Sequence, residues 1–157
     1  MSTLPDPPIV PMNEFEVSIE INAPSAITWS RLERVVDWPK WMPTVSSVVP
    51  ISNPALTVGG LFRIRQPKLP LAIWTVTALK DGESFVWQSR SIGVVTVAQH
   101  ILQPRSDTQC QLTLRLRFEG LLSAVATLVA GSLTRQYLEA EALALKRHSE
   151  RDAGMVI

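Results

Sequence analysis

Cysteine and histidine are scarce in this sequence, which limits the chemistry open to it. Cys110 is the only cysteine, so no disulfide can form within the chain. A lone cysteine in a strand pattern is more often a small packed side chain than a nucleophile. The two histidines belong to no paired His/Cys metal spacing, and the sequence has no glycine-rich phosphate loop and no Ser or Cys nucleophile motif. We therefore expect no metal and no cofactor.

An excess of charge is also missing. The chain has 15 basic and 14 acidic residues, which gives a net charge of +1. Proteins that bind nucleic acid usually carry a basic excess clustered on one face. We therefore do not expect nucleic acid as a partner.

Long hydrophobic runs are absent. The most apolar run, residues 121–133, is interrupted by Ser123, Thr127 and Ser132 and is shorter than the ~20 residues that cross a bilayer. The first residues show neither a basic start nor an apolar run of signal-peptide length. We therefore expect no transmembrane segment and a cytoplasmic location.

The length of the chain fits one domain. A chain of 157 residues can bury roughly two thirds of its unfolded surface, which is enough for one core. Four prolines near the start remove amide donors, which predicts a flexible Pro-rich tail over residues 1–13. No repeat or linker divides residues 14–150, so residues 14–157 are expected to form a single domain.

Alternation of polar and apolar residues predicts strands over most of the chain. In residues 14–21 every second residue is apolar, which predicts a strand with one wet face. The same reasoning predicts six further strands, over residues 45–51, 61–66, 71–79, 84–90, 93–103 and 109–118. Turn signals such as Asp81-Gly82 separate them, so these six form an antiparallel meander that the first strand joins as the seventh.

Helical patterns occupy two places. Pro24 suits the first turn of a short helix over residues 25–36, and a second short turn follows over residues 38–42. Residues 120–151 form the one long helical pattern. Its apolar side on a helical wheel, which we expect to be buried, holds Leu122, Val125, Ala126, Val129, Leu133, Tyr137, Ala140, Leu143 and Ala144.

This order of elements predicts an α+β fold in which the long helix lies across a seven-stranded sheet. An antiparallel sheet of this size twists and curls, and a helix of about 30 residues is about 45 Å long. A curved sheet meets a straight helix poorly in the middle. The gap is then either filled by large side chains or left as an apolar pocket, the usual form of a small-molecule site.

Several segments resemble a known family. The first is IEINAPSAITWSRLERVVDWPKWMPTVSSV, which is followed in order by VGGLFRIRQPKLP, by WTVTALKDGESFVWQSR and by FEGLL at the entry to the long helix. Together they resemble the START-like superfamily, also called SRPBCC, and within it the polyketide cyclase/dehydrase-type group. The resemblance covers residues 14–147. It implies a helix-grip fold around a cavity for lipids, polyketide-like molecules or other apolar small molecules.

His100 is the most informative polar residue in the strand pattern. With a period of two it shares a face with Ala98 and Leu102, and the resemblance places this face inward. There it could act as a general acid or base, or hydrogen-bond an oxygen of a ligand. The alternative is a packed histidine satisfied by a neighbour or by water.

Other candidate ligand-binding residues come from the strands and from the long helix. The resemblance points Trp74 and Trp87 toward the helix, where two indoles could form an apolar wall or simply fill the core. Val129 and Leu133 belong to the apolar side of the helix. Gln136 lies within that side, where it could meet His100 across the cavity or lie at the edge in water.

These observations give three hypotheses about function. The leading one is a protein that binds or transports an apolar small molecule, contacted by Trp74, Trp87, His100, Val129, Leu133 and Gln136. The second is a polyketide cyclase or dehydratase in which His100 takes or gives a proton. The third is a protein-interaction module, for which we expect a filled core and an exposed apolar patch. Members of the superfamily differ too much in activity for the resemblance to decide among these three functions. We expect the protein to be a monomer or a homodimer.

Overall fold

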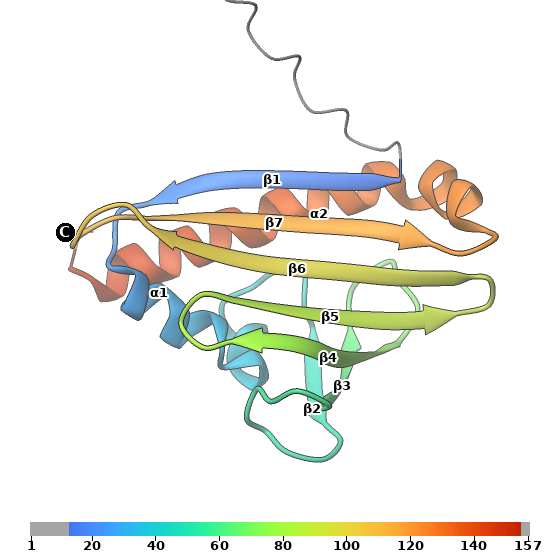
Figure 1. The fold of residues 1–157 in the computed structure, drawn as a ribbon, viewed down its shortest axis with the longest axis horizontal. Helices are drawn as coiled ribbons and strands as arrows, with labels where there is room; N and C mark the ends of the chain where they lie inside the picture. The colour runs from blue at the N-terminus through green and yellow to red at the C-terminus, as the bar shows by residue number, and fades with distance from the viewer. Residues whose placement is uncertain (1–12, 155–157) are drawn as a thin grey trace, which may run out of the picture.

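The computed structural model describes residues 13–154, in which one sheet is accompanied by one long helix and two short helices (Figure 1). The strands are β1 (Glu14–Ile21), β2 (Ser47–Pro50), β3 (Leu61–Arg65), β4 (Ala72–Lys80), β5 (Ser84–Ser91), β6 (Val94–Pro104) and β7 (Cys110–Glu119). The helices are α1 (Ser25–Leu32), the 3-10 helix η1 (Val35–Lys40) and α2 (Ser123–Asp152). The predicted tail, apart from its last residue, lies outside the described residues.

The sheet has the predicted topology. Its seven strands are ordered β1-β7-β6-β5-β4-β3-β2, and every neighbouring pair is antiparallel. The six strands from β2 to β7 form the meander, and β1 adds to its far side by pairing Phe15 with Leu116 and Ile21 with Cys110. In Figure 1, β2 and β3 run across the direction of β5, β6 and β7, so the sheet is strongly twisted. The α+β fold class is confirmed.

Alternation explains why these segments become strands. In β1 the apolar Phe15 and Ile21 are buried, whereas Glu16 and Glu20 are exposed on the other face. The same alternation in β3 buries Phe62 and Ile64. Because side chains on a strand alternate between its two faces, this spacing gives the sheet one dry concave face.

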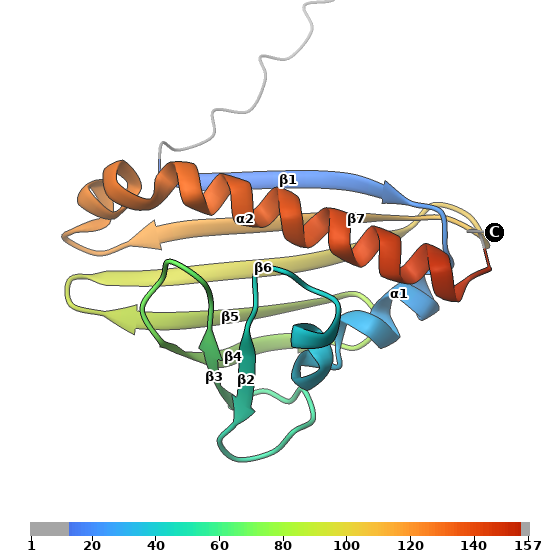
Figure 2. The same cartoon turned by 180° about the vertical axis from the view of Figure 1, so that it is seen from behind.

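Helix α2 lies along that concave face and packs mainly against β1 and β7 (Figure 2). Near its end it also packs against α1, where Arg31 pairs with Asp152. No helix among residues 13–154 combines the length and the apolarity needed to cross a membrane.

The predicted buried side of the long helix is only partly right: Ala126 and Ala144 pack against the core, but most of the large residues predicted to be buried are not. Leu122, Val125, Val129 and Leu143 are exposed, and the buried residues of α2 are instead Gly131, Leu138, Ala142, Leu145 and Ser149. Two causes account for the error. The first turns of α2 extend beyond the start of β1 (Figure 2), and their apolar side chains are exposed. Close packing also selects small residues: a Cβ on Gly131 would lie 3.3 Å from Cζ of Phe15.

The two short helices lie between β1 and β2 as predicted, but with different bounds. The first ends at Leu32 and not at residue 36, and the second is a 3-10 helix from Val35 to Lys40. The buried indole of Trp38 donates a hydrogen bond from Nε1 to the carbonyl of Leu32, 3.0 Å away. This bond satisfies a carbonyl at the end of α1 and fixes the turn between the two helices.

Candidate functional site

A cavity of about 420 Å³ lies between the sheet and α2. It is lined by concave residues of β4 to β7, by Trp38 of η1, by the loop between β3 and β4, and by one side of α2. Because α2 packs mainly on β1 and β7, the concave side of β4 and β5 is left facing this space. Sites for small molecules usually measure roughly 300–1,000 Å³ and are mostly apolar.

Tryptophans form one wall of the cavity, and for Trp74 and Trp87 a cavity wall was one of the two roles that the sequence left open. The two rings lie on the neighbouring strands β4 and β5 with centroids 5.4 Å apart, and both are buried. Trp87 also meets Trp38 at 5.3 Å and Phe85 at 5.3 Å, in each case edge to face. Trp87 is therefore the centre of an aromatic cluster that is part core and part cavity wall.

His100 lies in the same cluster, on the predicted inward face of β6. Its ring stacks on Phe85, the residue directly opposite on β5, with centroids 4.0 Å apart and an interplanar angle of 8°. Burial lowers the pKa of His100 to about 3, and the Phe85 backbone opposes this shift only in part. His100 is therefore neutral near pH 7. Its Nδ1 atom is buried without a hydrogen-bond partner among the described residues.

Glu141 brings a second titratable group to the cavity, from α2. Desolvation raises the pKa of its carboxyl to about 7, and a hydrogen bond from the Thr44 hydroxyl, with 3.4 Å between Oγ1 and Oε1, opposes the shift. A carboxyl with this pKa is present in both protonation states at neutral pH. It can then donate a hydrogen bond when protonated or accept one when ionised.

His100 and Glu141 also border a second, much smaller void of about 10 Å³ that adjoins the main cavity. The other residues around it, which include Leu112, Leu114 and Leu145, are almost all apolar. A space of this size holds about one water molecule. The cavity thus has aromatic walls and, at one place, two polar groups with unused hydrogen-bonding capacity.

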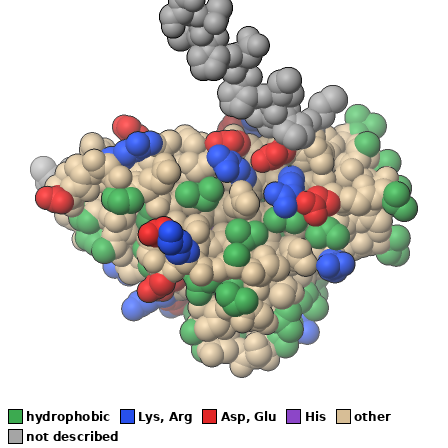
Figure 3. Space-filling view, viewed as in Figure 1, with side chains coloured by type: hydrophobic (Ala, Val, Ile, Leu, Met, Phe, Trp, Pro, Cys, Tyr) green, Lys and Arg blue, Asp and Glu red, His purple; other side chains and the backbone are tan. Residues whose placement is uncertain are grey.

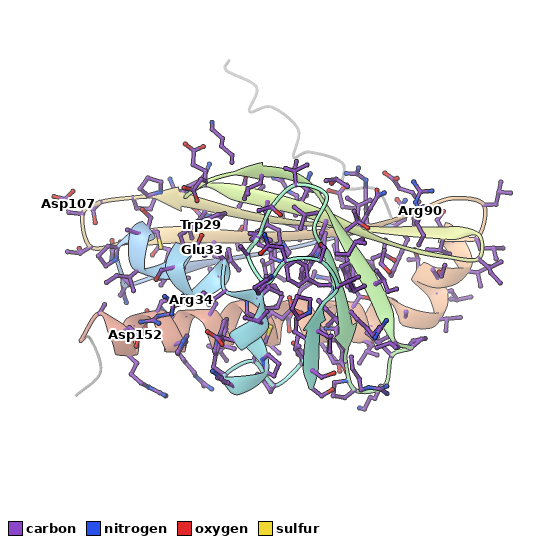
Figure 4. The ribbon with its side chains drawn as sticks, turned by 90° about the horizontal axis from the view of Figure 1, so that it is seen from below. Trp29, Glu33, Arg34, Arg90, Asp107 and Asp152 are labelled. Atoms are coloured by element: carbon purple, nitrogen blue, oxygen red, sulfur yellow. The ribbon has the colours of Figure 1, made fainter. Side chains whose placement is uncertain are left out.

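The mouth of the cavity lies between α2 and the loop that joins β3 to β4. Tyr137 of α2 donates a hydrogen bond from its hydroxyl to the carbonyl of Pro67 in that loop. Leu71, Arg90 and Ser91 line the cavity and are exposed, so they lie at its opening. Arg90 lies near one end of the molecule, as Figure 4 shows.

The sequence matches one known family over nearly its whole length. The family is described as polyketide cyclase/dehydrase and lipid transport, and the match spans residues 12–150. The chain belongs to this family. No curated protein matches the chain in sequence.

Solved structures of other proteins with the START-like fold resemble this member of the polyketide cyclase/dehydrase family. A START superfamily protein from Mycobacterium smegmatis has a TM-score of 0.69 at 15% identity, covering 88% of this chain and 97% of that one. Norcoclaurine synthase from Thalictrum flavum, in complex with dopamine and hydroxybenzaldehyde, has a TM-score of 0.69 at 13% identity; the match covers 94% of this chain and 95% of the synthase. The Zhui aromatase/cyclase from a Streptomyces species has a TM-score of 0.64 at 18% identity; the match covers 88% of this chain and 93% of the cyclase. At these identities the likeness establishes the fold.

Three of the predicted site residues lie outside the cavity of this family member. Val129 is 79% exposed, Gln136 is exposed, and Leu133 is half-buried but does not line the cavity. The residues of α2 that do line it are Ala130, Thr134, Tyr137, Leu138 and Glu141. The expectation that Val129, Leu133 and Gln136 face the cavity is therefore wrong, because the helix is rotated by about one residue from the predicted phase.

Glu141 and Thr44 are not among the site residues that the sequence predicts. The sequence carries one signal for Glu141: it lies three residues after Leu138 and four before Leu145, so it shares a side of the helix with both. That signal is weak because a glutamate on a long helix usually faces solvent. Among residues 13–154, no group of three or more His, Cys, Asp or Glu side chains is placed to hold a metal ion.

Proposed function

We propose that the protein binds an apolar small molecule, lipid or polyketide-like, that carries an uncharged hydrogen-bonding group such as a hydroxyl or a carbonyl. The observation that carries the proposal is a cavity of about 420 Å³ with an aromatic wall, which His100 and Glu141 line with titratable groups whose pKa values burial shifts. The apolar body of the ligand would lie against Trp74 and Trp87. Its polar group would take up the free hydrogen-bonding capacity of His100 and Glu141.

The chemistry of these two residues supports an uncharged ligand. His100 has a pKa of about 3 and is neutral near pH 7, and Glu141 has a pKa of about 7 and is partly neutral there. An anionic group buried beside them would meet the neutral His100 and a partly ionised Glu141, so it would find no positive charge there. Burying an unpaired charge is strongly unfavourable.

Nile red, an uncharged fluorescent dye, tests for an apolar cavity, and a library of lipids and aromatic alcohols can then compete with it. Ala130 lines the cavity, so Ala130→Leu fills part of it and should weaken dye binding by at least about tenfold. Ala124→Leu is the matched control, because Ala124 is exposed on the same helix, and it should bind like the wild type. The proposal fails if the wild type binds neither the dye nor any library member, or if Ala130→Leu binds as well as the wild type does.

Catalysis is the second candidate function, and the pKa of Glu141 favours it. A carboxyl with a pKa of about 7 can take a proton from a carbon between two carbonyls of a polyketide-like chain and later return one. The resulting enolate would attack another carbonyl of the same chain, forming a carbon–carbon bond, and loss of water would complete the dehydration. His100, whose pKa of about 3 keeps it neutral near pH 7, suits a hydrogen-bonding role better than that of a general acid.

A synthetic poly-β-ketone thioester tests this second function. Cyclised products should form faster with the wild type than in buffer, and Glu141→Gln should remove most of the acceleration. Dye binding should survive in Glu141→Gln. If the wild type gives the same products at the rate of buffer alone, the binding function stands without catalysis.

A further inference from the structure

Large apolar side chains lie exposed at one end of the molecule, where β5 turns into β6 and β7 turns into α2. Ile92 is 94% exposed, Leu121 98% and Leu128 87%. We call this set the apolar tip; its members are Ile92, Leu121, Leu122, Val125, Leu128 and Val129. Figure 3 shows hydrophobic side chains gathered at the corresponding end of the surface.

The two turns of the apolar tip are held together by the backbone. The amide of Leu122 donates a hydrogen bond to the carbonyl of Gly93, 2.9 Å away, which joins the start of α2 to the β5–β6 turn. Ile92 and Leu121 therefore project from neighbouring turns. Contiguous exposed apolar surface is rare on monomeric proteins and marks an interaction site.

The apolar tip adjoins the mouth of the cavity. β4 begins beside the end of β5, since Trp74 pairs with Ser89, so Leu71 and Arg90 at the mouth lie at the same end of the sheet as Ile92. The protein thus has a cavity and an exposed apolar patch together. A protein-interaction module was expected to combine an exposed apolar patch with a filled core. This protein has such a patch but also has the cavity.

Charge is distributed unevenly between the two ends of the molecule. Residues 61–73, 86–97 and 120–138, which lie toward the mouth and the apolar tip, contain no aspartate or glutamate. Their basic residues are Arg63, Arg65, Lys68, Arg90 and Arg135. Figure 4 shows Arg90 toward one end of the molecule, with Asp107 and Asp152 toward the other.

The acidic residue nearest to the apolar tip in the sequence is Glu119. Its carboxylate pairs with Nε of Arg117, so it leaves no net negative charge there. Arg90 is exposed two residues before Ile92 and makes no ion pair among the described residues. Arg90 is therefore an exposed positive charge beside the apolar tip that pairs with no carboxylate among the described residues; the other carboxylate at this end of the sheet is Glu14, which lies opposite Arg117.

We propose that the apolar tip docks on an anionic membrane surface. Ile92, Leu121 and Leu128 would enter the boundary between headgroups and acyl chains, and Arg90 would lie among the headgroups. Apolar side chains combined with basic residues are the features that bind a protein to the surface of an anionic bilayer without crossing it. The cavity mouth would then face the lipid.

A second copy of the chain fits this surface less well. Stable protein interfaces use roughly 20–30 residues on each side, far more than the six of the apolar tip. Those six come from two turns and the exposed start of a helix, which project from the molecule. Such projections suit insertion into a soft lipid surface better than contact with an identical, equally projecting surface.

Flotation with lipid vesicles tests the proposal directly. Wild-type protein should float with vesicles that contain about one third phosphatidylglycerol in phosphatidylcholine, and much less with phosphatidylcholine alone. A triple variant, Ile92→Ser with Leu121→Ser and Leu128→Ser, should bind at least about tenfold more weakly. Arg90→Gln should reduce binding about two- to fivefold, and added salt should reduce the binding of the wild type.

The control variant carries Ile51→Ser with Val58→Ser. These side chains are also exposed, at 44% and 62%, but they lie in the loop between β2 and β3, away from the start of α2 (Figure 1). This variant should float as the wild type does. All the altered side chains are exposed, so we expect the variants to keep the wild-type melting temperature. An unchanged melting temperature would show that the variants fold.

A fluorescent label gives a second measurement that tolerates weak binding. Cys110 is buried, so a maleimide dye should label Leu121→Cys or the control Val58→Cys at the new residue alone. A polarity-sensitive label at position 121 should shift to the blue on anionic vesicles, and the label at position 58 should not.

Three results would overturn the proposal. The first is that the wild type neither floats nor shifts the label with anionic vesicles. The second is that the triple variant binds as tightly as the wild type. The third is sedimentation as a dimer that the triple variant dissociates, which would assign the apolar tip to a second copy. None of these measurements needs a ligand in the cavity, so docking and the proposed ligand binding can fail separately.

Discussion

The hydroxyl of Tyr137 on α2 donates a hydrogen bond to the carbonyl of Pro67, and this bond ties the helix to the loop at the mouth of the cavity. A link between the two sides of an opening controls how fast a ligand enters and leaves. We therefore expect Tyr137→Phe to release Nile red faster, by about two- to tenfold, with a smaller change in affinity. Stopped-flow fluorescence measures both rates.

The control for this prediction is Thr77→Val. Thr77 also donates a side-chain hydrogen bond to a backbone carbonyl, that of Val86 at 3.3 Å, but it does not line the cavity. Its variant should exchange dye at the wild-type rate. Equal rates for the wild type and Tyr137→Phe would show that the link does not limit entry or release.

Glu141 should make stability depend on pH near neutrality. Its pKa is about 7 in the folded protein against 4.5 for an ordinary glutamate, so the folded state holds this proton more tightly. The stability that the group contributes is complete below pH 4.5 and is lost as the pH rises to 7. We expect Glu141→Gln, measured by urea unfolding, to be more stable than the wild type at about pH 8, by up to about 3 kcal/mol.

The advantage of Glu141→Gln should shrink as the pH falls toward 4.5. Glu139→Gln serves as the control, since Glu139 is exposed on the same helix, and it should show no such trend. A constant difference between Glu141→Gln and the wild type at all pH values would mean that the carboxyl does not titrate as described.

His100 should make the stability of the protein depend on acid. Its pKa falls from 6.5 in the unfolded chain to about 3 in the folded protein. Between these pH values the histidine is protonated in the unfolded chain and neutral in the folded protein. Stability should therefore fall as the pH drops from 6.5 toward 3, by at most about 1.4 kcal/mol per pH unit from this group. His100→Gln should flatten this slope, whatever its effect on stability at pH 7.

His148→Gln is the matched control for acid sensitivity. His148 is half-buried and stacks on Trp41 with centroids 4.8 Å apart, outside the cavity. That variant should keep most of the wild-type slope. If His148→Gln flattens the slope and His100→Gln does not, the buried histidine of β6 is not the acid-sensitive group.

Gly120 is needed where β7 passes into α2. Its φ is +103°, and a Cβ there would lie 2.6 Å from the carbonyl oxygen of Gly93. We expect Gly120→Ala to lower the free energy of unfolding by at least about 3 kcal/mol, because backbone atoms must move. Gly82→Ala, at φ +77° with open space around it, should lower it by only about 1–2 kcal/mol. Similar losses for both variants would show that the clash is relieved at little cost.

Most of the sheet could be predicted from the sequence because one face of each strand is buried. Residues such as Phe15, Phe62 and His100 follow the period of two, and Asp81-Gly82 marks a hairpin, so strand positions and orientations follow from local chemistry. The three strand residues predicted for the site, Trp74, Trp87 and His100, all line the cavity.

The helix side of the site could not be predicted in the same way. The first turns of α2 are apolar on nearly every side, so a helical wheel gives no reliable buried direction there. Contact with the sheet is made by small residues such as Gly131 and Ala142, whose hydrophobicity is low or moderate. Whether Glu141 faced solvent or the cavity depended on a rotation of the helix that only the tertiary packing fixes.

Because α2 rests on β1 and β7, the strands that anchor the helix differ from β4 and β5, which form much of the cavity wall. Substitutions on the concave side of β4, β5 and the opposite loop can alter the shape of the binding space while the anchoring of the helix stays intact. If the proposed binding function holds, substitutions of exposed residues at the mouth, such as Leu71 and Ser91, would change what the cavity accepts at little risk to folding, whereas Trp74 and Trp87 belong to the core as well. Solved structures that share only 13–18% of their residues with this chain have the same architecture.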